Sequence, residues 1–174
     1  MLLFKRVVSG WWLVASFCLL LQSSCGFQPI YGENSAFSGK TPLAGNLLIE
    51  NVKGREGQIL KIALEDKINP ERLAIVNPEY ILKLNLTKNL IPAVVKSDGT
   101  IQRYDIQFSS DFNLIQKSDG KVILTGKVTR TGSYNVAANA NFATYQAEQD
   151  ATSRTLNEIA EDYVLRIAGY FAKK

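Results

Sequence analysis

A strict alternation of apolar and polar side chains over residues 103–114 restricts the fold of this chain more than any other pattern in it. The polar series, from Arg103 to Asn113, contains no apolar residue. The apolar series is interrupted at Ser110 alone and otherwise consists of Tyr104, Ile106, Phe108, Phe112 and Leu114. Successive side chains of a strand point to opposite faces, so this pattern predicts a strand with one core face and one polar face.

The same period of two recurs before and after this segment. Its apolar positions are Leu82, Leu84 and Leu86 on one side and Val122, Leu124 and Val128 on the other. Both connections carry the tetrapeptide Lys-Ser-Asp-Gly, at 96–99 and 117–120. Asp-Gly is typical of tight reversals. We therefore expect a meander of three antiparallel strands whose two turns lie at opposite ends of the sheet.

Two segments show the spacing of amphipathic helices. Residues 58–68 form the first, which ends at Asn69 because Pro70 disfavours helical geometry in the residue before it. Residues 54–57, bounded by glycines, are expected to form the loop that enters this helix. The second helix is longer and carries the stripe Thr152, Leu156, Ile159, Tyr163, Ile167 and Tyr170. We expect Arg130, Tyr134 and Asn135 to lie between the last strand and this helix.

These elements predict one fold class. Residues 47–52 form a short β-leaning segment ahead of the first helix, which gives the order β-α-β-β-β-α. Both helices need a partner for their apolar stripes, and the sheet offers one apolar face. The economical solution is an α+β two-layer sandwich, in which two helices pack on one face of a four-stranded, mostly antiparallel sheet.

Composition argues against catalysis and metal binding. The chain of 174 residues has no histidine and two cysteines, which excludes histidine-dependent triads and a thiolate metal cage. Its carboxylates are scattered, and the glycine-bounded loop at 54–57 lacks the Lys-Ser/Thr ending of a phosphate-binding loop. We therefore predict no catalytic residue, no metal site and no enzyme activity.

The N-terminus has the features of an export signal. Lys5 and Arg6 precede a largely apolar run over residues 7–21, and small serines lead to Cys25. The alternative is an uncleaved membrane anchor, but fifteen helical residues would span about 22 Å of a hydrocarbon core of roughly 30 Å. Removing residues 1–24 leaves 150 residues with a net charge of +2 instead of +4, so nucleic-acid binding is not expected.

The position of Cys25 resembles the lipobox of bacterial lipoproteins, in which the cysteine becomes the first mature residue and carries diacylglycerol and an N-acyl chain. The alternative is a free thiol in a loop. The resemblance implies three parts: a lipoprotein signal peptide at 1–24, a lipidated N-terminus and tether at 25–46, and a single α+β domain at 47–174. No cofactor is expected apart from the covalent lipid.

The polar face of the predicted sheet has two interpretations. It is rich in amides, hydroxyls and charges of both signs, so it could simply be solvated. It could equally contact another polar wall, such as the lumen of an outer-membrane barrel. Alternation alone fits both.

Two segments resemble a known family. Residues 25–32, Cys-Gly-Phe-Gln-Pro-Ile-Tyr-Gly, are similar to the mature start of lipopolysaccharide-assembly lipoproteins of the LptE type. Residues 129–135, Thr-Arg-Thr-Gly-Ser-Tyr-Asn, with Phe142, Ala143, residues 147–151 and Arg154, resemble the second signature of that family. Phe142 stands where the family pattern has tyrosine. With the order of elements, the resemblance covers nearly all of the mature chain.

The resemblance implies a non-catalytic lipoprotein on the periplasmic face of the cell outer membrane. It would plug a β-barrel partner of the LptD type and assist passage of lipopolysaccharide to the surface. Because lipopolysaccharide is a polyanion, basic residues at turns or sheet edges are the candidate contacts. They are Lys96, Arg103, Lys117, Lys121 and Arg130. The alternatives are a periplasmic lipid-anchored binding module for a small ligand or glycan, and an envelope hydrolase with converging carboxylates.

Overall fold

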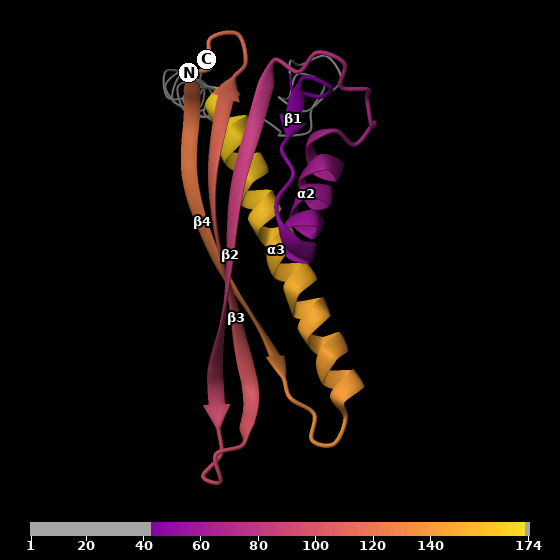
Figure 1. Cartoon of the computed structure of the whole chain (residues 1–174), viewed down its shortest axis with the longest axis vertical. Helices are drawn as coiled ribbons and strands as arrows, with labels where there is room; N and C mark the ends of the chain where they lie inside the picture. Colours follow the sequence, from indigo (N-terminus) through magenta and orange to yellow (C-terminus); the bar gives the residue numbers. More distant parts are fainter. Residues whose placement is uncertain (1–42, 173–174) are drawn as a thin grey trace, which may run out of the picture.

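The computed structural model describes residues 43–172. In chain order its elements are β1 (Leu47–Ile49), α2 (Gly54–Ile68), β2 (Tyr80–Val95), β3 (Ile101–Gln116), β4 (Val122–Asn135) and α3 (Asn141–Ala172) (Figure 1). The predicted β-α-β-β-β-α order and the α+β class are confirmed. The predicted signal peptide and Cys25 lie outside the described residues.

The four strands form one mixed sheet in the order β1-β2-β3-β4. β1 runs parallel to the start of β2, with Leu47 opposite Tyr80, and α2 supplies the crossover that parallel neighbours need. β2, β3 and β4 are antiparallel. Their two turns therefore lie at opposite ends of the sheet, as predicted (Figure 1).

Both Asp-Gly turns are closed by their aspartates. The Asp98 carboxylate accepts a hydrogen bond of 2.9 Å from the backbone N–H of Thr100, and Asp119 accepts one of 3.1 Å from Lys121. The glycines that follow have φ of +82° at Gly99 and +69° at Gly120, a region that side chains disfavour. The repeated tetrapeptide is thus explained by turn geometry.

The alternation in β3 predicts the core face correctly. Ile106, Phe108, Phe112 and Leu114 are all buried. Ser110 is buried among them, and its hydroxyl donates a 2.9 Å hydrogen bond to the backbone carbonyl of Asn85, so the polar atom is satisfied. The helices contribute the residues that cover this face: Leu60, Leu64, Leu156, Ile159, Tyr163 and Ile167.

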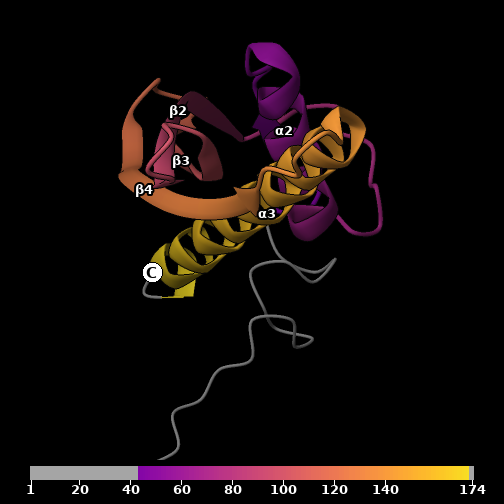
Figure 2. The same ribbon diagram turned by 90° about the horizontal axis from the view of Figure 1, so that it is seen from below.

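Both helices lie on the same side of a strongly curved sheet (Figure 2). α3 packs mainly against β4 and α2. Gly132 of β4 allows this close approach, because a Cβ atom there would collide with the Thr155 hydroxyl of α3. Gly126 of β4 instead makes room for a neighbouring strand, since a Cβ atom there would lie 2.5 Å from the Phe112 ring of β3. No helix within residues 43–172 combines the length and the apolarity needed to cross a membrane.

Two predicted boundaries are wrong. α2 begins at Gly54, so the glycine-bounded segment predicted as a loop is its first turn, and Gly57 lies against Val52, where a Cβ atom would be 2.8 Å from the valine Cβ. β4 continues to Asn135, so Arg130, Tyr134 and Asn135 belong to the strand and not to the connection after it. Glycine is the reason for both errors, because it is typical of loops but is needed here for other reasons. Gly54 has a positive φ of 84°, and Gly57 and Gly132 lie at close contacts that leave no room for a Cβ atom.

Candidate functional site

The fold leaves uncovered the face of the sheet that is turned away from the helices, and we call it the polar sheet face. None of its side chains is buried. The pairing register aligns them in rungs across the three long strands, for example Asn85–Asp111–Lys127 and Thr87–Ser109–Thr129. The other members are Lys83, Asn89, Arg103, Asp105, Gln107, Asn113, Thr125, Thr131, Ser133 and Asn135.

Contacts within the polar sheet face are few and weak. The Ser109 and Thr129 hydroxyl oxygens are 3.1 Å apart, and the Ser133 hydroxyl donates to Asp105 over 2.8 Å. Lys127 lies 4.0 Å from Asp111, an exposed pair worth at most about 1 kcal/mol. Most donors and acceptors of this face are therefore available to another surface.

The predicted basic contacts do not form one patch. Lys96 follows β2 at the tip of the β2–β3 hairpin, and Arg103 lies near that tip on the polar sheet face, opposite Val94 and Asn135. Lys117 and Lys121 flank the β3–β4 turn at the opposite end of the sheet. These four residues therefore form two separate pairs at opposite ends of the sheet, Lys96 with Arg103 and Lys117 with Lys121.

Arg130 points to the helix side of the sheet. It lies opposite Phe108 in the register, and its guanidinium forms a 2.6 Å ion pair with Asp162 of α3. Its charge is therefore compensated within the fold. The position expected between strand and helix is corrected to a strand position that ties β4 to α3.

Sequence reasoning missed a second cation on the same rung. Lys88 also lies opposite Phe108, and its ammonium contacts Glu148 of α3 at 2.9 Å and Glu56 of α2 at 3.4 Å. Burial acts to lower the pKa of Lys88, but the two carboxylates outweigh it and raise that pKa above its ordinary value. The available signal was the break in the apolar series of β2 after Leu86.

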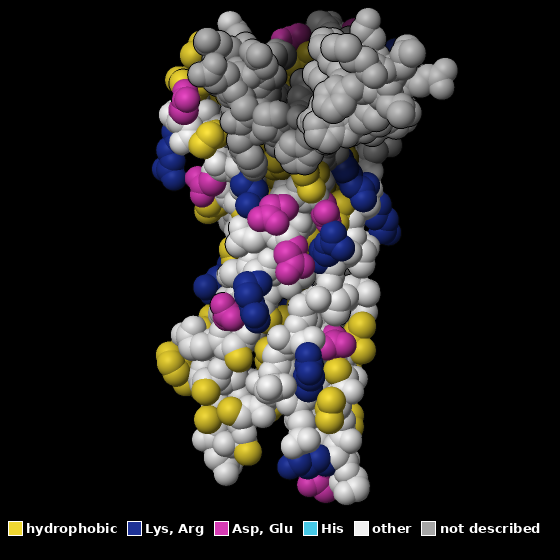
Figure 3. All heavy atoms as spheres, turned by 180° about the vertical axis from the view of Figure 1, so that it is seen from behind, with side chains coloured by type: hydrophobic (Ala, Val, Ile, Leu, Met, Phe, Trp, Pro, Cys, Tyr) yellow, Lys and Arg dark blue, Asp and Glu magenta, His cyan; other side chains and the backbone are white. Residues whose placement is uncertain are grey.

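The end of the β2–β3 hairpin carries exposed apolar side chains, and we call residues 90–103 the distal arm. Leu90, Ile91, Val94 and Val95 are 40–54% exposed and occupy both faces of β2. Phe142 and Tyr145, at the start of α3, are also exposed. Figure 3 shows hydrophobic side chains on both lower arms of the molecule. The sequence signal was the pairing of adjacent apolar residues, which breaks strict alternation.

The described residues contain no cluster of three or more histidine, cysteine, aspartate or glutamate side chains that could hold a metal ion. The polar sheet face instead presents hydroxyls, amides and single charges spread over three strands. Such an arrangement can form many hydrogen bonds with another polar surface.

Comparisons with known proteins agree with this architecture. The sequence model of a lipopolysaccharide-assembly family, LptE, matches residues 44–167. An uncharacterised protein of Rickettsia prowazekii is 25% identical over 162 residues, which cover 93% of this chain and 97% of that protein.

Solved structures share the fold. A candidate lipoprotein from Caulobacter crescentus superposes with a TM-score of 0.59 at 23% identity, covering 75% of this chain and 93% of its own. Rare lipoprotein B from Shewanella oneidensis superposes with a TM-score of 0.56 at 12% identity, covering 74% of this chain and 96% of its own.

Proposed function

This chain belongs to the lipopolysaccharide-assembly family LptE, and from that premise we propose that it is a non-catalytic lipoprotein of the outer membrane. It binds and plugs a β-barrel partner of the LptD type and assists transfer of lipopolysaccharide to the cell surface. A covalent lipid on Cys25 holds it on the periplasmic face of that membrane.

The observation that supports this proposal is the polar sheet face. It extends over three long strands, and none of its side chains is buried. The interior of a wide outer-membrane barrel is polar, so it matches a face made of amides, hydroxyls and balanced charges. An apolar partner surface would leave these groups unpaired, at a cost of about 1–3 kcal/mol for each buried group.

The lipid anchor is compatible with this location. Leu43, where the described structure begins, lies eighteen positions after Cys25. A fully extended chain of that length reaches about 60 Å, so the domain can enter a barrel while its lipid stays in the leaflet.

Lys96 and Arg103 are the best placed of the predicted lipopolysaccharide contacts. They share the hairpin tip with the exposed Val94 and Val95. Lipopolysaccharide combines phosphates with acyl chains, so cations beside apolar side chains suit both parts of it.

Affinity purification from detergent-solubilised membranes tests the barrel proposal. We expect the full chain to recover one outer-membrane β-barrel. Ser109→Arg with Thr129→Arg, on the polar sheet face, should reduce this recovery at least about tenfold by placing unpaired charges in the contact. Asn157→Arg, on the exposed side of α3, is the matched control and should retain binding. Recovery of no barrel, or equal loss in both variants, contradicts the proposal.

The anchor has its own test. Cys25→Ala should leave the leader uncleaved by the lipoprotein pathway and mislocalise the domain. The intact mass of the wild-type mature N-terminus should include the diacylglycerol and N-acyl groups, and an unmodified Cys25 thiol rules the anchor out.

A further inference from the structure

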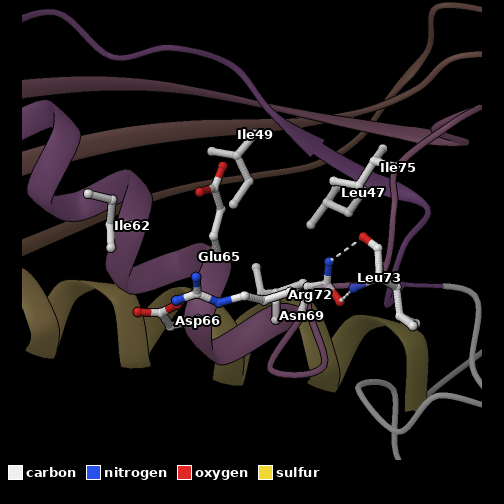
Figure 4. A pocket seen from close by; sticks show the side chains of 10 residues that line it. Leu47, Ile49, Ile62, Glu65, Asp66, Asn69, Arg72, Leu73 and Ile75 are labelled. Atoms are coloured by element: carbon white, nitrogen blue, oxygen red, sulfur yellow. Dashed lines mark hydrogen bonds and ion pairs between the residues drawn. The ribbon is translucent and has the colours of Figure 1, made fainter.

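An open apolar pocket of about 620 Å³ lies between β1, α2 and the loop that follows α2 (Figure 4). Its apolar lining consists of Leu47, Ile49, Ile62, Ile68, Leu73 and Ile75. The first, second and fourth of these are buried, whereas Ile62 is 54% exposed and Leu73 and Ile75 are 39% and 37% exposed. The floor of the pocket therefore belongs to the core, whereas the side chains of its walls are partly exposed to solvent.

The loop wall of this pocket is held in place by the fold itself. The Asn69 side chain donates to the carbonyl of Leu73 and accepts from its N–H, both over 2.9 Å. Arg72, with φ of +50°, forms a 3.2 Å ion pair with Asp66 of α2. These contacts connect residues 69–73 to one another and to α2, beside the pocket (Figure 4).

The chain enters the described structure beside this wall. Leu43 is fully buried in the core, and the next turn packs on the loop, because a Cβ atom on Gly45 would lie 3.4 Å from the Leu73 Cβ. The described part of the chain therefore begins close to the loop wall of the pocket.

The residues before Leu43 contain an apolar cluster that a solvated tether does not need. Phe27, Pro29, Ile30 and Tyr31 fall within five positions, whereas the stretch that follows is rich in glycine, serine and other polar residues. Tyr31 is twelve residues from Leu43, a span that reaches up to about 40 Å when extended. The cluster can thus reach the pocket with slack to spare.

We propose that residues 27–31 of this same chain dock in the pocket and cover Ile62, Leu73 and Ile75. Burying apolar groups from both sides drives this association. The rim carries the carboxylates of Glu65 and Asp66, and Arg72, the one cation among the lining residues, is paired with Asp66. The rim therefore offers no unpaired cation to a lipid phosphate and suits an uncharged peptide segment better. Docking fixes the N-terminal segment to the β1 and α2 end of the domain, leaving the distal arm at the far end. Because docking is intramolecular, it stands independently of a barrel partner.

Site-specific photo-crosslinking of the full chain in membranes tests this assignment. A photo-reactive phenylalanine analogue at Tyr31 should crosslink within one chain, to peptides that contain Ile62 or residues 73–75. Digestion and mass spectrometry locate the crosslink, and the mass of the intact product separates one chain from two. Crosslinks to lipid, to a second copy or to another protein in place of these peptides overturn the proposal.

Two charged variants provide a matched comparison. Ile62→Glu in the pocket wall should lower the crosslink yield about tenfold, because it places a charge in the apolar contact. Leu165→Glu, on α3 and 51% exposed, should leave the yield unchanged. Ile75→Glu repeats the test from the loop wall if the α2 variant fails to fold, as judged by circular dichroism. Equal yields in all folded variants contradict docking.

Discussion

The two halves of β2 have similar apolar content and different surroundings. Tyr80 and Leu82 are buried and Leu84 and Leu86 are half-buried, but Leu90 on the same face is 42% exposed. The helices account for this gradient, because α3 packs mainly against β4 and α2 and so diverges from the distal end of β2. An apolar alternation therefore predicts a strand, but it does not predict how far along the strand a second layer extends.

A single rung shows the same contrast across the sheet. Leu90, Ile106 and Gly132 are aligned on β2, β3 and β4. Ile106 is fully buried and Gly132 lies under Thr155 of α3, while Leu90 at the other end of the rung remains exposed. The covered region is thus diagonal, following α3.

The largest expected effect comes from charging the covered face. Phe108→Asp places a carboxylate in a fully buried position and should cost at least about 4 kcal/mol in the free energy of unfolding. Gln107→Asp, one residue away on the polar sheet face, should cost no more than about 0.5 kcal/mol. Denaturant titration of both variants checks this. Equal losses of stability would mean that the assignment of Phe108 to the core face and Gln107 to the polar sheet face is wrong.

Truncation along one face of β2 measures the gradient directly. Leu82→Ala should destabilise by about 2–5 kcal/mol because it leaves a cavity in the core. Leu90→Ala should cost less than about 1 kcal/mol, since part of this side chain is already in water. Chemical denaturation gives both values. Similar losses would show that the distal arm is covered in solution.

A smaller loss is expected where α3 meets β4. Gly132→Ala should cost about 1–3 kcal/mol through its collision with the Thr155 hydroxyl. Thr155→Ala removes that oxygen, so the double variant should be more stable than the sum of the two single losses implies. A double-mutant cycle measures this coupling. Strict additivity would mean that the helix does not approach the strand as closely as the structure has it.

The smallest effect at neutral pH is expected inside the covered half, at Tyr163. Burial raises the pKa of its phenol to about 12 from an ordinary value of 10.0. The folded protein holds this proton more tightly than the unfolded chain does. The resulting stability is complete below pH 10 and is lost as the pH rises through 12, by up to about 3 kcal/mol.

Tyr163→Phe should change stability little at pH 7, because the hydroxyl has no hydrogen-bond partner among the described residues. Between pH 10 and 12 the variant should lose less stability than the wild type, as measured by denaturation at each pH. Tyr80 and Tyr134, whose pKa values burial also raises, keep some pH dependence in the variant. Identical profiles for both proteins would contradict the burial of this phenol.

Sequence patterns predicted the fold well where the side-chain period alone determines an element. The alternation around Phe108 correctly identified which side chains of β3 face the core, and the Asp-Gly pairs correctly predicted both turns. The patterns failed where glycine serves packing between elements. Gly57 led to the prediction of a loop where α2 begins, although this glycine is needed for the close contact with Val52. Gly132 led to the prediction that β4 ends early, although this glycine is needed for the close contact with α3.

The candidate surface was less predictable for a related reason. The outward residues of β3 follow from alternation, but the partners of charged residues depend on helices distant in sequence. The sequence predicts Arg130 as a lipopolysaccharide contact, whereas in the structure Asp162 neutralises its charge. Lys88 is not among the predicted residues, although it joins β2 to both helices. Charge alone could not separate a structural ion pair from a ligand contact such as the one proposed for Arg103.

The short pairing of β1 has a consequence for handling the protein in isolation. Within residues 43–172, β1 is the strand that pairs with the outer edge of β2. This pairing ends at Leu82 of β2, which lies opposite Ile49. From Lys83 to Val95 that edge offers unpaired backbone donors and acceptors, the template on which chains stack and precipitate. Pro92 protects part of this edge because it has no N–H, whereas the charge of Lys83 is compensated by Glu50 at 3.1 Å. A concentrated preparation of the isolated protein is therefore expected to self-associate along β2.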